Sequence, residues 1–369
     1  MSKKTKIGIG IIGCGNISDA YFNGAKKFEV LHTISCADLN HEAATAKAEE
    51  HGCIAQSVDE LLANPDVDLV INLTVPAVHA EVSIKALEAG KHVHCEKPLA
   101  VTLEDGRKVI DLAKEKGLLV GCAPDTFLGA GMQTCRKLID DGWIGKVIGG
   151  SAFMMSRGPE SWHPNPKFFY EVGAGPMFDM GPYYITALVH LLGPVKRVAA
   201  ITSKAFDVRT ATCKEQFGLP LPVEIPTHYS GTLEFHSGAS VSVTISFDVY
   251  AHNHKPIEIY GTEGSVGVPD PNTFGGPVSL WTPTTGEWKE QGFSHPYSDN
   301  SRSIGAADMA MTILSGGTHP HKSSGALAYH ALEVMHAFEK SSVSGTHTVI
   351  ESKPEQPAAL PLGLIEGRV

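Results

Sequence analysis

Short apolar runs alternate with amphipathic stretches through the first third of the chain. The apolar-rich runs fall at residues 6–12, 30–38, 54–55, 69–73, 92–95 and 118–122. Runs of this kind are typical of strands buried in a parallel sheet. The stretches with apolar residues at helical spacing fall at residues 17–28, 42–51, 77–89 and 102–116, with a shorter one after Ser57. Strands and helices in this order predict an α/β fold with a doubly wound parallel sheet over residues 1–123.

The pattern changes beyond residue 123. A helix is expected at residues 131–140 and a strand at 146–155, followed by an irregular loop at 157–172 and a helical segment ending at Leu192. β-Branched residues then dominate runs at 195–203, 228–235, 239–250, 257–260 and 265–268, and helices return at 304–314 and 326–340. Glycine-containing turns between these runs favour antiparallel pairing of neighbouring strands. Residues 124–369 are therefore predicted to form an α+β domain on an open, mostly antiparallel sheet.

The overall composition narrows the kinds of partner. The chain has 369 residues, 42% of them hydrophobic, and a formal net charge of −10. That charge argues against a nucleic acid or an anionic membrane surface, because both attract basic faces. No apolar run reaches the ~18 residues of a membrane span, and the basic start lacks the apolar segment of a signal peptide. We therefore expect a cytoplasmic globular protein.

Cysteine and histidine offer no evident metal site. The seven cysteines are dispersed without a C-x-x-C pair, which favours reduced core thiols over disulfides. The 18 histidines include no H-E-x-x-H motif and no Cys/His cluster. We therefore expect no bound metal.

A glycine turn follows the first expected strand and leads directly into a helix. Its sequence is Gly13-Cys14-Gly15-Asn16-Ile17. The first glycine permits a tight turn, the second leaves room for a phosphate, and the helix start favours negative charge. Glycine turns also join strands to helices for structural reasons alone, but the strand before and the helix after favour a dinucleotide site here.

Asp38 ends the second expected strand, 23 residues after Gly15. In dinucleotide-binding folds an acid about 20 residues past the glycine turn binds the ribose 2′-hydroxyl. The alternative is an ordinary turn residue. Since Leu39, Asn40 and His41 follow in place of an arginine, a 2′-phosphate has no evident partner, and we expect NAD rather than NADP.

Two loops at strand ends carry candidate chemistry, because ligands of doubly wound sheets bind at the carboxyl ends of the strands. In the first, Thr74 and Val75 are expected to wall the nicotinamide, Pro76 to begin the following helix beside the cofactor, and His79 to face either the cofactor or the surface. The second contains Glu96 and Lys97, directly after a buried strand. Charged residues there favour a functional site over a solvated ion pair.

Together these motifs resemble the Gfo/Idh/MocA family of glucose–fructose oxidoreductase-like and inositol dehydrogenase-like proteins. The resemblance rests on the glycine turn, Pro76-x-x-His79, the Gly90–Ala100 run with Glu96-Lys97-Pro98, Leu138-Ile139-x-x-Gly142-x-Ile144-Gly145, and Gly173-x-Gly175-x-x-x-Asp179-x-Gly181-x-Tyr183. It implies an N-terminal Rossmann domain and a C-terminal domain whose open sheet serves in oligomer contacts. It also implies NAD(P)-dependent oxidation or reduction of a sugar, polyol or related carbonyl.

The resemblance also implies roles for individual residues. Lys97 corresponds to the family's catalytic lysine and Asp179 to its substrate-contacting acid. Tyr183 stands where many members place a catalytic histidine. Tyrosine has an ordinary pKa near 10, but a nearby ammonium favours the phenolate. We therefore hypothesise a couple in which Lys97 lowers the pKa of Tyr183, the proton acceptor, although Tyr183 could instead be a core residue.

Two further segments are candidates for the substrate pocket. The loop at residues 158–166 presents Trp162 and His163 between prolines, which suits either a sugar or an oligomer contact. Asp125 and Phe127 follow the last strand of the first domain and replace the residue types often seen there in relatives. Their side chains are expected to line the same pocket.

The sequence and this resemblance together predict an NAD-preferring oxidoreductase that transfers a hydride to or from a cyclic sugar or polyol. The resemblance further implies a homodimer or homotetramer. Two alternatives have the same fold. One is an NAD-dependent glycosidase that works through transient oxidation, and the other is a non-catalytic, cofactor-binding regulator. The presence of both Lys97 and Asp179 argues against the regulator.

Overall fold

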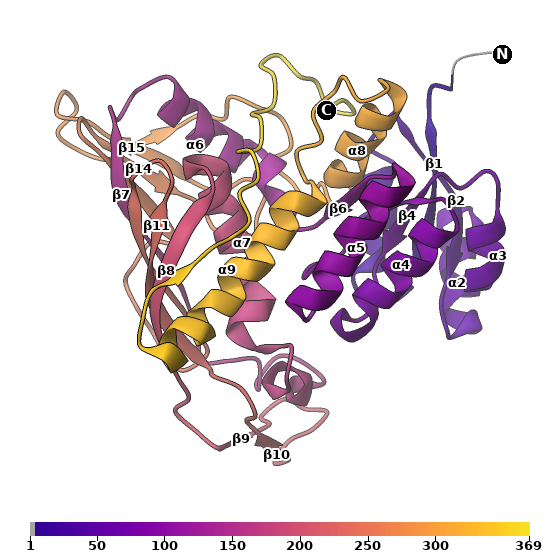
Figure 1. Ribbon diagram of the computed structural model, residues 1–369, viewed down its shortest axis with the longest axis horizontal. Helices are drawn as coiled ribbons and strands as arrows, with labels where there is room; N and C mark the ends of the chain where they lie inside the picture. The colour runs from indigo at the N-terminus through magenta and orange to yellow at the C-terminus, as the bar shows by residue number, and fades with distance from the viewer. Residues whose placement is uncertain (1–3) are drawn as a thin grey trace.

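A computed structural model describes residues 4–369, and it contains two main sheets that lie side by side in the chain's N- and C-terminal parts (Figure 1). The N-terminal sheet has six parallel strands in the order β3-β2-β1-β4-β5-β6. This confirms the predicted doubly wound sheet. Its strands are β1 (Ile7–Ile12), β2 (Leu31–Ala37), β3 (Ile54–Ala55), β4 (Leu69–Asn72), β5 (His92–Cys95) and β6 (Val120–Cys122).

Helices cover both faces of this sheet. They are α1 (Ser18–Ala25), α2 (His41–His51), α3 (Val58–Ala63), α4 (His79–Glu88) and α5 (Leu103–Lys116), and a short 3-10 turn, η1 (Pro76–Val78), precedes α4. Residues of α1 and α2 join one hydrophobic cluster, whereas residues of α3, α4 and α5 join a second cluster on the opposite face. The buried strands are therefore apolar on both sides, as their sequence indicated.

Local signals define the ends of these helices. Ser57 and Glu60 form a reciprocal capping box at the start of α3, and the Thr102 hydroxyl accepts the backbone N–H of Asp105 at the start of α5. Gly52 and Gly117 end α2 and α5 in the left-handed conformation. The helix boundaries in this domain are thus encoded by nearby residues.

The second sheet has nine strands in the order β16-β15-β14-β13-β7-β12-β11-β8-β17. Its strands are β7 (Val147–Met155), β8 (Val195–Ser203), β11 (His228–Phe235), β12 (Ser240–Ser246), β13 (Ile257–Gly261), β14 (Ser265–Val268), β15 (Val278–Trp281), β16 (Lys289–Gln291) and β17 (Thr348–Val349). Neighbouring strands are antiparallel except β7 and β12, which pair in parallel. A separate small ribbon contains β9 (Val208–Thr210) and β10 (Pro220–Pro222).

Three helices cover one face of the nine-stranded sheet, and Figure 1 shows its other face without helices. These helices are α6 (Ala130–Asp140), α7 (Gly175–Leu192) and α9 (Gly325–Ser344). The short 3-10 segments η2 (Thr126–Leu128) and η3 (Pro166–Tyr170) lie in the loops before α6 and α7. This arrangement confirms the predicted α+β domain on an open sheet.

Helix α7 continues through Pro182. A proline inside a helix removes one backbone hydrogen bond. Here nearly the whole helix is buried between other elements, so tertiary packing offsets that loss. Asp179 and Tyr183 therefore lie one turn apart on the same helix.

The chain returns to the first domain near its end. Helix α8 (Ile304–Leu314) packs against α1 and β6, and the backbone N–H of Cys122 donates to the carbonyl of Ser323. The segment before α8 is anchored as well, since the Ser303 hydroxyl donates to the carbonyl of Tyr21. Residues far apart in sequence thereby reach the edge of the N-terminal sheet.

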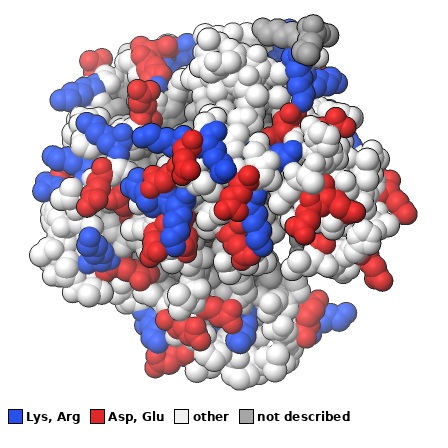
Figure 2. Space-filling model, turned by 45° about the vertical axis from the view of Figure 1, so that its right-hand side comes forward, with Lys and Arg blue, Asp and Glu red and all other residues white. Residues whose placement is uncertain are grey.

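The surface carries mixed charge. On the face drawn in Figure 2, lysine and arginine side chains are interspersed with aspartate and glutamate. Among residues 4–369, no helix combines the length and apolar character that crossing a membrane requires.

Candidate active site

The carboxyl ends of three neighbouring strands bring the predicted loops together. Ile12 of β1 pairs with Asn72 of β4, which pairs with Cys95 of β5. The glycine turn, the loop that contains Thr74 (the Thr74 loop) and the loop that contains Lys97 (the Lys97 loop) each begin within two residues of these paired strand ends. The sheet therefore places the expected cofactor and catalytic residues along a single edge.

Gly13 and Gly15 have different surroundings in the turn. Gly13 has a φ of 104°, and a Cβ there would lie 2.6 Å from the carbonyl oxygen of Leu73. A Cβ on Gly15 would meet nothing within 4 Å. Gly13 is thus required for the turn itself, whereas Gly15 leaves open space at the start of α1, as a pyrophosphate needs. Asn16 is exposed and Ile17 half-buried beside that space.

Asp38 connects the end of β2 to the glycine turn. One carboxylate oxygen accepts the backbone N–H of Cys14 at 2.7 Å, and the other accepts that of Asn40 at 2.8 Å. Leu39 is fully exposed and no arginine follows. The carboxylate is therefore fixed beside the turn, with lone pairs left for a ribose hydroxyl.

Asn72, the last residue of β4, holds the Thr74 loop through side-chain hydrogen bonds. The Thr74 hydroxyl donates to Asn72 at 2.7 Å, Val75 is 59% exposed, and Pro76 begins η1. His79, which was expected to face the cofactor or the surface, is instead buried and only 1% exposed. Its two ring nitrogens contact the carbonyl oxygens of Pro98 and Thr74, so the ring has no free nitrogen to offer a cofactor.

Glu96 fixes the backbone of the catalytic loop. Its carboxylate accepts the hydroxyl of Tyr21 at 2.6 Å and the backbone N–H of Lys97 at 2.9 Å. Because Tyr21 lies on α1, the same carboxylate ties the dinucleotide helix to the loop that carries the lysine. Glu96 is itself buried.

A cluster of three side chains forms at this edge, from Lys97, Asp179 and Tyr183. The Lys97 ammonium donates to the side-chain oxygen of Asp179 at 2.9 Å and to its backbone carbonyl at 2.8 Å. The same nitrogen lies 5.3 Å from the centre of the Tyr183 ring. The Lys97 side chain is 18% exposed, so one side of the cluster stays open to solvent.

Burial and charge act in opposite directions on this cluster. Burial disfavours the Lys97 ammonium, but Asp179, with Tyr183 and Glu96, raises its pKa above the ordinary value. Burial raises the pKa of Tyr183, and the positive charges of Lys97 and Arg302 only partly oppose that shift. Lys97 thus lowers the pKa of Tyr183, as expected, but desolvation of the phenolate outweighs the ammonium and leaves that pKa above its ordinary value.

Arg302 lies close to this cluster, although no sequence motif marks it. It lies in the turn before α8, where its guanidinium faces Tyr183, and it is also near Asp125, Tyr21 and Glu96. A single arginine in a polar segment gives no periodic or motif signal. Only the return of α8 to the first domain brings it to this edge.

Asp125 and Phe127 lie deeper than expected. The Asp125 carboxylate accepts the backbone N–H of Gly305 at 3.0 Å, and burial raises its pKa to about 6. Phe127 is 2% exposed and packs against His190 of α7. Both side chains are therefore buried in the core, whereas the sequence predicted that they line an open pocket.

Trp162 and His163 lie in the loop between β7 and α7. Trp162 is 66% exposed and meets the edges of the His163 and Phe169 rings. An aromatic face is thus presented to solvent on a loop anchored by buried Phe169.

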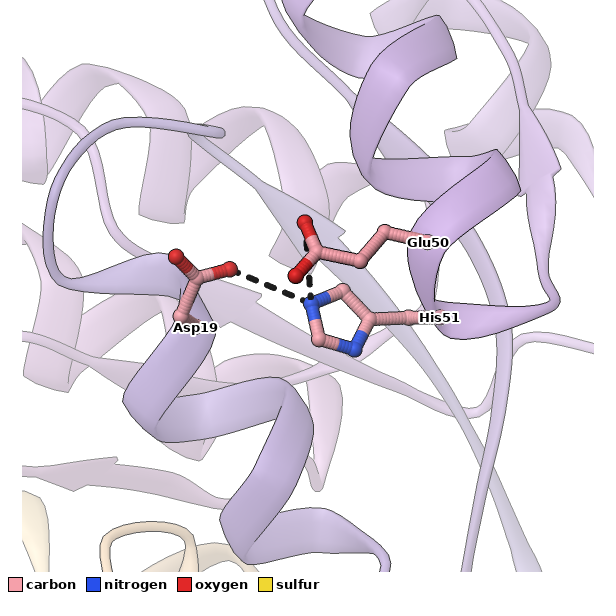
Figure 3. Close-up of side chains that lie close together, drawn as sticks. All are labelled: Asp19, Glu50 and His51. Carbon is pink, nitrogen blue, oxygen red and sulfur yellow. Dashed lines mark hydrogen bonds and ion pairs between the residues drawn. The ribbon is translucent and has the colours of Figure 1, made fainter.

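One three-residue group in the described part of the chain has metal-ligand geometry. Figure 3 shows Asp19 of α1 and Glu50 and His51 of α2 pointing toward one another. The Lys47 ammonium, however, contacts Asp19 at 2.5 Å and Glu50 at 2.8 Å. A lysine already supplies the positive charge here, and we interpret the group as a link between two helices.

Comparison with known proteins defines the family. Residues 7–123 match the model of an oxidoreductase family with an NAD-binding Rossmann fold, and residues 132–267 match the GFO/IDH/MocA C-terminal domain. A 1,5-anhydro-D-fructose reductase of Ensifer adhaerens is 30% identical over 264 residues, which is 70% of this chain and 74% of the relative. A levoglucosan dehydrogenase of Pseudarthrobacter phenanthrenivorans is 27% identical over 70% of this chain and 73% of its own length.

Solved structures share the whole fold. A levoglucosan dehydrogenase in complex with NADH has a TM-score of 0.79 at 22% identity and covers 94% of this chain and 100% of its own. An aldose-aldose oxidoreductase from Caulobacter crescentus, complexed with glycerol, has a TM-score of 0.78 at 23% identity and covers 93% of this chain and 99% of its own. The chain belongs to the GFO/IDH/MocA oxidoreductase family, and its N-terminal domain is an NAD-binding Rossmann domain.

Proposed function

We propose that this protein is an NAD-preferring oxidoreductase that transfers a hydride between nicotinamide and a hydroxyl or carbonyl group of a sugar, polyol or related cyclic compound. The contact of Lys97 with Asp179 and Tyr183, at the sheet edge that carries the glycine turn, supports this most directly. The names of its relatives, which are reductases and dehydrogenases of sugars and anhydrosugars, agree with the substrate class.

Lys97 is suited to stabilise negative charge on a substrate oxygen. When bound, NAD supplies the nicotinamide carbon that accepts or gives the hydride. The Lys97 ammonium has three N–H groups, of which two are directed at Asp179, so one remains for the substrate. Its raised pKa keeps the ammonium charged at neutral pH. In our proposal Lys97 is therefore an electrostatic stabiliser rather than a base.

Tyr183 is the proposed proton donor and acceptor. Its raised pKa keeps the phenol protonated at neutral pH, which suits donation of a proton to a carbonyl oxygen during reduction. In the oxidative direction the phenolate must form before it accepts the hydroxyl proton. The oxidation rate is therefore expected to rise with pH.

The remaining site residues have proposed binding roles. Gly15, Asn16 and Ile17 would contact the pyrophosphate, and Asp38 the ribose, which favours NAD over NADP. The exposed ring of Trp162, with neighbouring His163, offers the flat apolar face on which a sugar ring stacks. Asp125 and Phe127 would shape the pocket from below.

A substrate panel tests the proposal. Sugars, anhydrosugars and polyols would be offered with NAD and with NADP, and formation of the reduced cofactor would be followed by absorbance. We expect turnover of at least one member, with NAD preferred. Cofactor binding without any turnover would instead indicate a regulator, and tightly retained NAD with cleavage of glycosides but no net NADH would indicate the glycosidase alternative.

We also propose a homodimer or homotetramer formed through the uncovered face of the nine-stranded sheet. A hollow of about 590 Å³ is lined by residues of β8, β11 and β12 and by residues at and just after the end of α9. Ile201 of β8 is 74% exposed there and Val349 of β17 is 67% exposed. Exposed apolar residues on a broad sheet favour association.

We propose a cytoplasmic location on the basis of the cysteines. All seven are free thiols in the structure, and six of them are buried. Free thiols persist in reducing compartments.

A further inference from the structure

His79 occupies a position between the two loops of the site. It is the first residue of α4, directly after η1, and the loop that contains Thr74 precedes it. Its ring reaches across to Pro98, which follows Lys97 in the loop after β5. One side chain thus bridges the expected nicotinamide wall and the loop of the proposed catalytic lysine.

Both ring nitrogens of His79 meet groups that can only accept hydrogen bonds. Nδ1 lies 2.7 Å from the carbonyl oxygen of Pro98, and Nε2 lies 2.9 Å from that of Thr74. A neutral imidazole has one N–H and one lone pair, so it can satisfy only one of these oxygens. The other contact would set two lone pairs against each other, at a side chain that is only 1% exposed. Only the doubly protonated imidazolium satisfies both carbonyls.

A buried cation requires a balancing charge, and Cys95 is the group placed to supply it. The Cys95 thiol hydrogen-bonds both the His79 ring and the Ser83 hydroxyl of α4, and the Asn72 amide of β4 donates to the backbone carbonyl of His79 at 3.0 Å. The remaining titratable neighbours are the thiols of Cys95 on β5 and, beyond it, Cys122 on β6.

The pKa shifts of His79 and Cys95 agree with an imidazolium paired with a thiolate. Burial opposes ionisation of both partners. Cys95 and the two carbonyls nevertheless raise the pKa of His79 to about 9, and contacts with Cys122, His79 and Ser83 lower the pKa of the Cys95 thiol to about 5. Each partner thus favours the charged form of the other.

We propose that His79 is a buried imidazolium, balanced by a Cys95 thiolate, that ties the Thr74 loop to the Lys97-Pro98 loop and fixes the spacing between nicotinamide and the lysine. His79 is thereby a positioning residue and touches neither substrate nor cofactor. The protonation state is independent of the proposed function, whereas the effect on turnover rests on it.

Nitrogen-15 NMR of histidine-labelled protein tests the protonation state without any substrate. The His79 signals would be assigned as those absent from a His79→Gln variant, or from a His79→Asn variant if the first does not fold. We expect both ring nitrogens to be protonated from pH 6 to about pH 8. A neutral tautomer, with one unprotonated nitrogen in this range, would overturn the proposal.

A Cys95→Ser variant tests the balancing charge. Serine cannot ionise here, so His79 should lose one ring proton at a lower pH than in the wild-type protein. Cys135→Ser is the matched control, because Cys135 is also a fully buried thiol but lies on α6. Identical His79 titrations in the wild-type and Cys95→Ser proteins would overturn the assignment of Cys95 as counter-ion.

Kinetics of His79→Gln test the positioning role. A misplaced lysine should lower kcat on the order of 10- to 100-fold while the affinity for the substrate changes less. His330→Gln is the control, since His330 is a buried histidine of α9 that accepts the backbone N–H of Val195, at the start of β8. If a substrate is known and the kcat of His79→Gln is unchanged, the positioning role is overturned and the proposed function is left intact.

Discussion

At the scale of single residues, two carboxylates hold Lys97 in complementary ways. Glu96 accepts its backbone N–H and so fixes where the side chain starts, whereas Asp179 accepts from the ammonium and fixes where it ends. Asp179 also raises the pKa of Lys97, against the effect of burial. The lysine is thus a permanently charged group held in one orientation, which is what stabilising a developing alkoxide requires.

Replacing this charge should remove most of the activity. We expect Lys97→Met to lower kcat on the order of 10²-fold or more, because transition-state charge is no longer stabilised. The measurement is steady-state turnover of the substrate found in the panel. Lys85→Met is the control, since Lys85 is an exposed lysine paired with Glu81 on α4. Near-normal turnover in Lys97→Met would contradict the mechanism.

The proton role of Tyr183 has a signature in the pH profile. Because its pKa is raised, oxidation by the wild-type enzyme should accelerate as the pH rises toward that pKa, and reduction should slow over the same range. Tyr183→Phe should lower the rate in both directions and abolish this dependence. The test is the pH dependence of kcat from pH 6 to 10. A profile of unchanged shape in Tyr183→Phe would move the proton role to another group.

At the scale of elements, the strand–turn–helix unit β1–α1 combines a structural glycine with a binding glycine. Gly13 adopts a positive φ and lies against the backbone of Leu73, whereas nothing lies near Gly15. The two positions look alike in sequence but serve different ends. The same substitution, made at each position in turn, should therefore have different effects.

We expect Gly13→Ala to destabilise the fold and Gly15→Ala to affect binding alone. The first places a Cβ 2.6 Å from a carbonyl oxygen at an unfavourable φ and should cost about 1–3 kcal/mol of unfolding free energy. The second should leave stability unchanged and weaken NADH binding by roughly 10-fold or more, by narrowing the approach of the phosphate. Denaturant unfolding and fluorescence titration measure the two effects. Equal loss of stability in both variants would contradict this division.

At the scale of the whole molecule, the two faces of the nine-stranded sheet differ in character. One is covered by α6, α7 and α9, and the other is open (Figure 1). The open face lies opposite the face that α7 packs on, and α7 carries Asp179 and Tyr183. Association through the open face would therefore brace the active-site helix without covering the site.

A charge on the open face should disrupt assembly. We expect Ile201→Glu to shift the protein from a dimer or tetramer toward monomers, because two like charges would meet at the interface. Size-exclusion chromatography with light scattering measures the mass. Leu362→Glu is the control, as Leu362 is 61% exposed but lies in the C-terminal tail. A wild-type protein that is monomeric at micromolar concentration would contradict the proposed assembly.

Much of the fold follows from local sequence. The six parallel strands, the capped helices and the five principal β-branched runs of the second domain were all predicted, because periodicity, caps and turns depend on residues close together in the chain. The short strands β9, β10, β15, β16 and β17 were not predicted. They have only two to four residues each, too few for a periodic signal.

Residues close together in the chain account for the dinucleotide fold, the glycine turn and the loop that carries Lys97. The tertiary structure completes the site around them. It paired β7 with β12 in parallel, continued α7 through Pro182, brought Arg302 to the first domain and turned His79 inward between two carbonyls. These outcomes depend on which distant segments meet and on the balance of desolvation and charge where they do. That balance is a property of the folded molecule and of no single stretch of its chain.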